Sequence, residues 1–116
     1  MMQEGLAITA AMRVTPGYPE RDYLEFHPGW LAKCREKDRE ILAGIRPFLA
    51  DSSNETLSRF IFGAGSSGLE REVYYAGYRA VGHLLKRGRT LAQLARVDEA
   101  DTPALMNATL AEILAG

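Results

Sequence analysis

The sequence predicts an all-α fold, a compact bundle of five or six short helices. Three observations favour this class. No segment alternates apolar and polar residues over the length that a half-buried strand needs. Apolar residues recur at helical spacing in several windows, and clusters of proline and glycine separate those windows. The 116 residues fit one domain, residues 1–116, that is long enough to bury a core.

Helix breakers and capping residues set the expected bounds of the helices. A loop rich in proline and glycine covers residues 14–20, and Pro47 ends or kinks a helix near residue 45. Gly88 stands just after the longest helix, where a left-handed residue is favoured, and Pro103 opens the last one. The expected helical segments are 2–12, 21–26 (a single turn), 30–45, 55–62, 69–87, 91–95 and one capped by Asp101 or Thr102.

Composition excludes several classes of partner. The chain has 14 basic and 15 acidic side chains and a formal charge of −1, so nothing global favours nucleic acid or an anionic membrane. No apolar run approaches the length of a membrane span, and the first residues lack the basic region of a signal peptide. The single cysteine, Cys34, cannot form an intramolecular disulfide. We therefore expect a cytoplasmic protein without a membrane or nucleic-acid partner.

The segment 63–68 reads GAGSSG and precedes the longest helix. A glycine-rich loop before a helix can bind phosphate through backbone N–H groups. Here no strand is expected before the loop and no lysine follows at the P-loop position. We therefore interpret residues 63–68 as a flexible connector.

Residues suited to catalysis are sparse. His27 and His83 lie 56 positions apart and belong to no HxxxH or HxH pair, so structural roles are favoured over metal ligation. Cys34 lies on the apolar stripe of its helix, which favours a buried, inert thiol over a nucleophile. No serine has the GxSxG setting of a hydrolase. The chain thus holds no complete catalytic constellation.

Residues 70–86 form the longest helical pattern and hold three of the five tyrosines. Gly77 lies in mid-helix, where glycine costs about 1 kcal/mol relative to alanine. Such a residue indicates close approach of another backbone or space for a ligand, and we favour close helix packing. The alternative is a small-molecule pocket lined by Tyr74, Tyr75, Tyr78, Arg79 and His83.

Four segments, in this order, carry a family resemblance: EGLA at 4–7, WLAKCREKDREIL at 30–42, FIFG to YYAGYRAV at 60–81, and LLKRGRTLAQLAR at 84–96. Together they resemble the C-terminal half of bacterial predicted zinc-dependent proteases of the gluzincin type. In that family an HExxH helix precedes the EGLA segment, and a later helix carries a GYxxGYxxV-like pattern. The resemblance covers nearly the whole chain and implies the C-terminal helical subdomain of such a metallopeptidase.

The resemblance carries over residue by residue. Glu4 matches the EGLA glutamate, which the resemblance implies as the third zinc ligand. Four residues match the later pattern: Tyr74, Gly77, Tyr78 and Val81. Val73, in contrast, stands where the family often has glycine. The sequence contains no HExxH, the motif that would supply two imidazole ligands and the water-activating glutamate. One carboxylate cannot hold catalytic zinc, so we expect no cofactor in the isolated chain.

Three functional hypotheses follow. The first is a non-catalytic helical domain that self-associates as a two-fold homodimer, because loss of an N-terminal half would uncover apolar surface. The second is part of a zinc metallopeptidase whose HExxH segment lies upstream or on a partner chain, so that Glu4 binds zinc with it. The third is a helical bundle that binds a small molecule beside the helix containing Gly77.

Overall fold

Helices form all the regular structure that is described. The computed structural model describes residues 1–51, 53–63, 65 and 67–116, and within them no strand occurs. The all-α prediction is therefore confirmed, although these residues form eight α-helices rather than five or six. They are α1 (Met2–Val14), α2 (Glu20–Leu24), α3 (Trp30–Glu36), α4 (Asp38–Ile45), α5 (Asn54–Leu57), α6 (Glu72–Lys86), α7 (Leu91–Ala95) and α8 (Thr102–Ala115). A 3-10 turn, η1 (Arg46–Phe48), follows α4, and a π-helical turn, η2 (Ser58–Phe62), follows α5.

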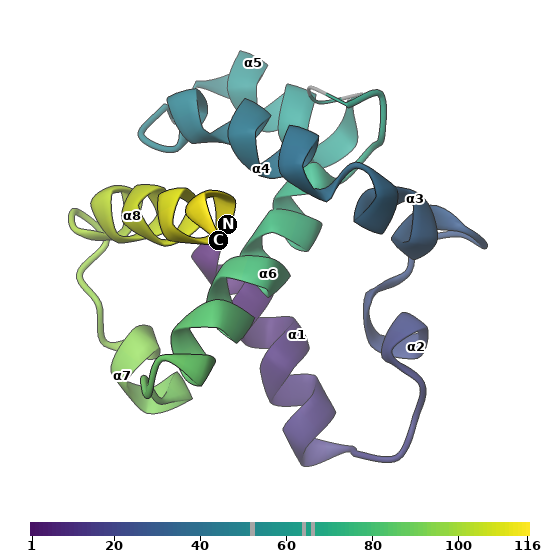
Figure 1. The fold of residues 1–116 in the computed structure, drawn as a ribbon, viewed down its shortest axis with the longest axis vertical. Helices are drawn as coiled ribbons and strands as arrows, with labels where there is room; N and C mark the ends of the chain where they lie inside the picture. The colour runs from purple at the N-terminus through teal and green to yellow at the C-terminus, as the bar shows by residue number, and fades with distance from the viewer. Residues whose placement is uncertain (52, 64, 66) are drawn as a thin grey trace.

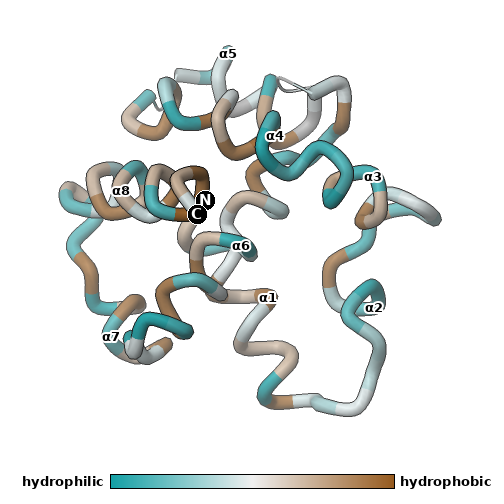
Figure 2. The backbone as a smooth tube through the Cα atoms, in the orientation of Figure 1, coloured by the Kyte–Doolittle hydropathy of each residue, from teal (hydrophilic) through white to brown (hydrophobic). Residues whose placement is uncertain are grey.

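Helix α6 is the central element of the fold. It runs obliquely through the middle of the molecule and crosses α1, while α7 and α8 lie on one side, α2 and α3 on the other, and α4 and α5 over one end (Figure 1). Figure 2 shows hydrophobic and hydrophilic stretches alternating along α4 and α6, as expected for helices with one buried face. The largest fully buried side chains include Trp30, Ile41, Leu42, Tyr75, Val81, Leu94, Met106 and Leu110.

The crossing of α1 and α6 depends on two glycines. A Cβ atom built on Gly77 would lie under 3.0 Å from the carbonyl oxygen of Met1, and one on Gly5 would clash with the carbonyl of Gly77. The close helix packing predicted for Gly77 is thus confirmed. Helix α1 runs through Gly5 to Val14, and the lack of a side chain at Gly5 lets the two backbones meet.

The start of α6 differs from the prediction. The expected helix began at residue 69, but α6 begins at Glu72. Arg71 has a left-handed backbone with φ of 59°, and this conformation breaks the helical path before Glu72. The carbonyl of Glu70 lies outside the helix and accepts a hydrogen bond of 2.9 Å from the indole nitrogen of Trp30. The C-terminal end agrees with the prediction, since α6 ends at Lys86 and Gly88 has φ of 95°.

The helix expected over residues 30–45 is interrupted. Lys37 has φ of −104° and ψ of 20°, which separates α3 from α4. Its ammonium group donates a hydrogen bond of 2.8 Å to the carbonyl oxygen of Ser67. The expected end near Pro47 is confirmed, because α4 stops at Ile45 and continues as the 3-10 turn η1.

The predicted cap of the last helix is found in part, since Asp101 occupies the N-cap position of α8 but its side chain makes no capping hydrogen bond. Ser53 caps α5 by accepting from the backbone N–H of Thr56, and the predicted helix 55–62 changes from α to π geometry at Ser58. Thr90 caps α7. The connector predicted over residues 63–68 lies partly outside the described residues. No helix in the described ranges combines the length and apolar character needed to cross a bilayer.

Candidate functional site

A carboxylate of α4 joins two of the predicted pocket residues. The hydroxyl of Tyr75 donates to Asp38 Oδ1 over 2.5 Å. Arg79 donates to the same carboxylate twice, from Nε to Oδ1 over 2.7 Å and from Nη2 to Oδ2 over 3.2 Å. Tyr75 and Arg79 are four residues apart on α6, so both reach the first residue of α4 from one helix face.

Electrostatics hold this cluster in one charge state. Burial raises the pKa of the Asp38 carboxyl, but hydrogen bonds from Arg79 and Tyr75 outweigh it, and the net pKa lies below its usual value. Burial, together with the Asp38 carboxylate, raises the pKa of the Tyr75 hydroxyl. The hydrogen bond to Asp38 raises the pKa of Arg79, so at neutral pH the cluster is an anion held by a cation and a neutral phenol. The cluster of Asp38, Tyr75 and Arg79 stabilises the packing of α4 against α6.

Tyr78 belongs to a second polar group. Its hydroxyl donates to Glu20 Oε2, while Arg35 donates to Glu20 Oε1 over 2.5 Å. These contacts tie α6 to α2 and α3. Burial and the neighbouring Glu20 raise the pKa of Tyr78 to about 12, so the phenol stays a hydrogen-bond donor at physiological pH.

The other two predicted pocket residues face different neighbours. The ring of Tyr74 packs edge-on against Phe26, with 5.0 Å between ring centroids and 67° between planes. His83 Nε2 lies 3.3 Å from Glu112 Oε1 without a well-directed hydrogen bond. The structure therefore unites Tyr75 and Arg79 and separates Tyr74, Tyr78 and His83, and the space beside Gly77 is filled by α1.

Glu4, the implied zinc ligand, is turned toward the start of its own helix. Its Oε2 atom is shielded from solvent and lies 2.8 Å from the α-ammonium group of Met1, although no directed hydrogen bond reaches it. The described ranges contain no group of three or more His, Cys, Asp and Glu side chains placed to hold a metal ion. A zinc site composed of these residues alone does not fit, because Glu4 would be a single ligand.

The remaining candidates occupy structural positions. Cys34 is a buried free thiol, as expected, and burial with the nearby Glu72 and Glu25 raises its pKa to about 12. A thiol in this state is a poor nucleophile. His27 lies at the surface, with Nε2 3.2 Å from Glu70 Oε1.

Comparison of the chain with protein-family models, curated proteins and solved structures gives no match. The metallopeptidase resemblance therefore rests on the four short sequence segments that carry it.

Among the hollows of the described residues, two were not indicated by the sequence and bear on function. An apolar groove of about 510 Å³ opens where the start of α1 meets the residues after η1, α7 and the start of α8. Its apolar lining comes from Met1, Met2, Leu6, Leu49, Leu94, Val97, Pro103 and Met106. A second hollow, of about 240 Å³, lies at the other end of α1. Each combines segments far apart in sequence, so no local pattern could reveal it.

Proposed function

We propose that this chain is a non-catalytic helical domain that pairs with a second copy through α1. The supporting observation is the exposed face of this helix, which carries no charge. Gln3, Ala7, Ala11 and Val14 follow one another at steps of four and three residues, lie on one side of α1, and are exposed. Val14 is 82% exposed, the most of the large apolar side chains that lie at the surface.

Exposed helix faces without charge are found on α1 and also on α8, where Ala104, Ala108 and Ala115 lie on one side. Charged residues make up 25% of the sequence, and the exposed faces of helices normally carry them. On α1 the charged residues are Glu4, which is paired with the α-ammonium of Met1, and Arg13, near the end of the helix. Alanine side chains let two helix backbones approach closely. A second α1 packed antiparallel across a two-fold axis would cover the face on both copies at once.

The apolar groove extends this face. Gln3 belongs to the exposed face of α1 and also lines the groove, together with Met1, Met2 and Leu6 of the same helix segment. The surface of α1 therefore continues into a hollow lined mainly by methionine and aliphatic side chains, with the acidic Asp51 and Glu99 also in its lining. Contiguous apolar surfaces of this kind mark protein–protein interfaces, and methionine adapts to an irregular partner.

Sedimentation velocity at tens of micromolar tests the proposal. We expect the wild-type chain to sediment as a dimer and the Ala7→Glu and Ala11→Glu variants as monomers, because each places a charge in the centre of the interface. Ala108→Glu is a matched control, since Ala108 is an exposed alanine inside α8, and it should remain dimeric. A monomeric wild-type chain, or a control that dissociates as readily as the α1 variants, would contradict the proposal.

A second candidate is a part of a zinc metallopeptidase. The observation in its favour is that Glu4 Oε2 is shielded from solvent and accepts no hydrogen bond. Two imidazole ligands and a water-activating glutamate would have to come from an HExxH segment outside these residues. Two tests are decisive: the DNA before the Met1 codon, read for an in-frame HExxH, and the zinc content of the purified protein. Stoichiometric zinc in the wild-type protein that is lost in the Glu4→Gln variant supports this function. A wild-type protein without zinc, together with a stop codon shortly before Met1, opposes it.

A further inference from the structure

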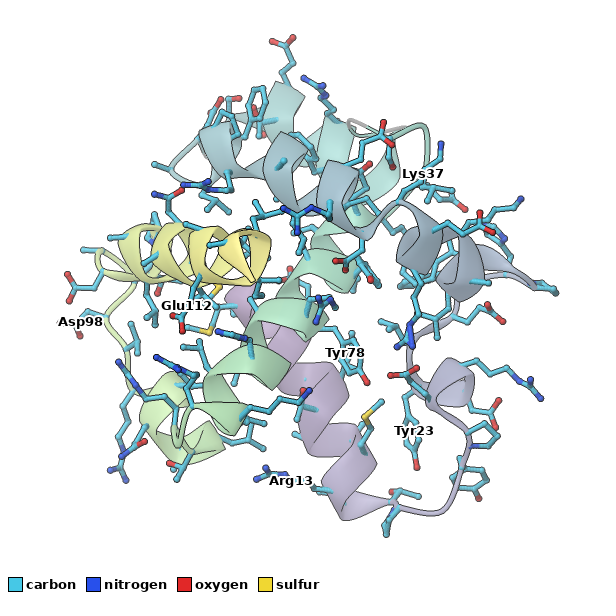
Figure 3. All side chains as sticks on the ribbon, in the orientation of Figure 1. Arg13, Tyr23, Lys37, Tyr78, Asp98 and Glu112 are labelled. Atoms are coloured by element: carbon cyan, nitrogen blue, oxygen red, sulfur yellow. The ribbon has the colours of Figure 1, made fainter. Side chains whose placement is uncertain are left out.

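The hollow of about 240 Å³ lies where the end of α1, the loop before α2, α2 itself and α6 meet. Three of the five tyrosines of the chain, Tyr18, Tyr23 and Tyr78, contribute to its lining, with Met12 and Glu20 beside them. Tyr23 and Tyr78, both labelled in Figure 3, come from α2 and α6 and approach the same space next to α1. We refer to this hollow as the tyrosine pocket.

Hydrogen bonds hold two of the three rings of the tyrosine pocket in place. The hydroxyl of Tyr23 donates to the carbonyl oxygen of Thr15, and that of Tyr78 donates to Glu20. The rings of Tyr18 and Tyr23 are 6.1 Å apart and nearly perpendicular, at 76°. Two walls of different orientation are therefore formed before any ligand arrives, and a preorganised site loses less entropy on binding.

The tyrosine pocket has one charged group in its wall. Glu20 is the charged residue among the lining residues that the structure describes. Its carboxylate accepts hydrogen bonds from Tyr78 and from Arg35, which approaches from α3, forms an ion pair with Glu20 and does not line the pocket. The pocket wall therefore presents the carboxylate end of an ion pair, while the guanidinium lies behind it. The hydroxyl protons of Tyr23 and Tyr78 are donated within the protein, so these two residues offer their π-faces to a ligand.

We propose that the tyrosine pocket binds small organic cations of the quaternary-ammonium class. Such cations bind over aromatic faces because the ring quadrupole attracts positive charge, and they need no hydrogen-bond donor or acceptor in return. The Glu20 carboxylate, which lines the pocket while its partner Arg35 does not, disfavours an anion or a zwitterion that brings its own carboxylate. The expected ligand is therefore choline-like rather than betaine-like, and the site is separate from the exposed α1 face proposed for self-association.

Titration of the ¹⁵N-labelled chain with choline, followed by NMR, tests this proposal. We expect saturable shifts of the backbone amides of Gly17, Tyr18 and Tyr23, and weaker shifts with glycine betaine. The neutral isostere 3,3-dimethylbutan-1-ol should give no saturable shift. Equal responses to choline and the neutral isostere, or shifts that stay linear with concentration, would overturn the proposal.

Matched variants separate binding from folding. Tyr18 is 61% exposed, so Tyr18→Leu should keep the native spectrum and weaken choline binding about five- to tenfold, whereas Tyr18→Phe keeps the affinity. Phe26→Leu, an aromatic substitution outside the pocket, should bind choline normally. An affinity for choline that is unchanged in a folded Tyr18→Leu variant would contradict the proposal.

Vesicles of phosphatidylcholine distinguish a lipid headgroup from a free ligand. We expect the chain to stay in the supernatant when such vesicles are sedimented, because the tyrosine pocket accommodates a compact cation. Sedimentation with the vesicles, combined with no saturable response to free choline, would also overturn the proposal.

Discussion

The backbones of α1 and α6 touch at Gly5 and Gly77. A Cβ atom on either glycine would come under 3.0 Å from a backbone atom of the opposite helix, a separation that real Cβ atoms essentially never show. The closest atoms are backbone, the carbonyl of Gly77 for Gly5 and the carbonyl oxygen of Met1, the residue before α1, for Gly77, so relief requires movement of the main chain. This pair of glycines therefore sets the distance between the central helix and the helix that carries the proposed dimer face.

Gly77→Ala should destabilise the chain by about 2 kcal/mol, the upper cost of overpacking less the gain in helix propensity. The added methyl group overlaps the carbonyl of Met1, and overpacking in a filled interior typically costs 1–3 kcal/mol, roughly, and sometimes more. Better helix propensity would return about 1 kcal/mol of that loss. Urea denaturation followed by circular dichroism at 222 nm measures the difference.

Gly82→Ala is the matched control for that experiment. Gly82 lies in the same helix, and among the described residues nothing falls within 4 Å of a Cβ built on it. Alanine there should raise the stability by about 0.5–1 kcal/mol. If both substitutions moved the free energy of unfolding in the same direction, the glycine contact would not determine the spacing of α1 and α6.

The two glycines also show what the sequence can and cannot predict. A glycine inside a long amphipathic pattern is costly, so Gly77 was correctly predicted as a point of close packing. Its partner was not identified, because Gly5 lies near a helix end, where glycine is weakly informative. Helix α7 was predicted to the residue, since its cap lies in the adjacent sequence.

Long-range contacts explain the failures. The local sequence around Lys37 favours one continuous helix, yet the structure breaks the helix there. Asp38 accepts hydrogen bonds from Tyr75 and Arg79, and Lys37 donates one to the carbonyl of Ser67. These partners are at least 30 residues away, so tertiary contacts override the local preference. The tyrosine pocket was missed for the same reason.

Asp38→Asn should cost about 2 kcal/mol at neutral pH, because it weakens charge-assisted hydrogen bonds from Arg79 and Tyr75. The folded state lowers the pKa of this carboxyl, so the stabilisation is present above its ordinary value of 3.8 and is lost as the pH falls below it. The stability gap between wild type and variant should therefore narrow in acid, as measured by urea denaturation from pH 7 to pH 3, roughly.

Asp22→Asn supplies the comparison for Asp38. Asp22 is exposed on α2, and its substitution should change the stability by about 0.5 kcal/mol or less. If the difference in the free energy of unfolding between wild type and Asp38→Asn stayed constant down to low pH, the carboxylate charge would not stabilise the α4–α6 contact.

Cys34 should resist thiol reagents until the chain unfolds. Its side chain is buried, and its pKa of about 12 keeps it protonated at pH 8, roughly, where an exposed cysteine reacts. The unfolded thiol ionises near 9.0, so wild type should lose stability relative to Cys34→Ala as the pH rises above that value. Ellman's reagent measures the first effect, and denaturation from about pH 8 to 10.5 measures the second. Fast stoichiometric labelling of the native chain would refute the buried position.

Thr90→Ala should loosen α7 by about 1 kcal/mol. Thr90 Oγ1 accepts from the Gln93 N–H over 3.1 Å, and the Gln93 side chain accepts from the Thr90 N–H over 2.9 Å. A helix of five residues has few other hydrogen bonds, so residues 91–95 should exchange amide hydrogens faster, while the centre of α6 should not. Because Leu94 lines the apolar groove, the variant should also weaken the proposed dimer. Thr90→Ser retains the capping hydroxyl and should restore both properties; equal damage by serine and alanine would show that the methyl group of Thr90, not its cap, holds α7.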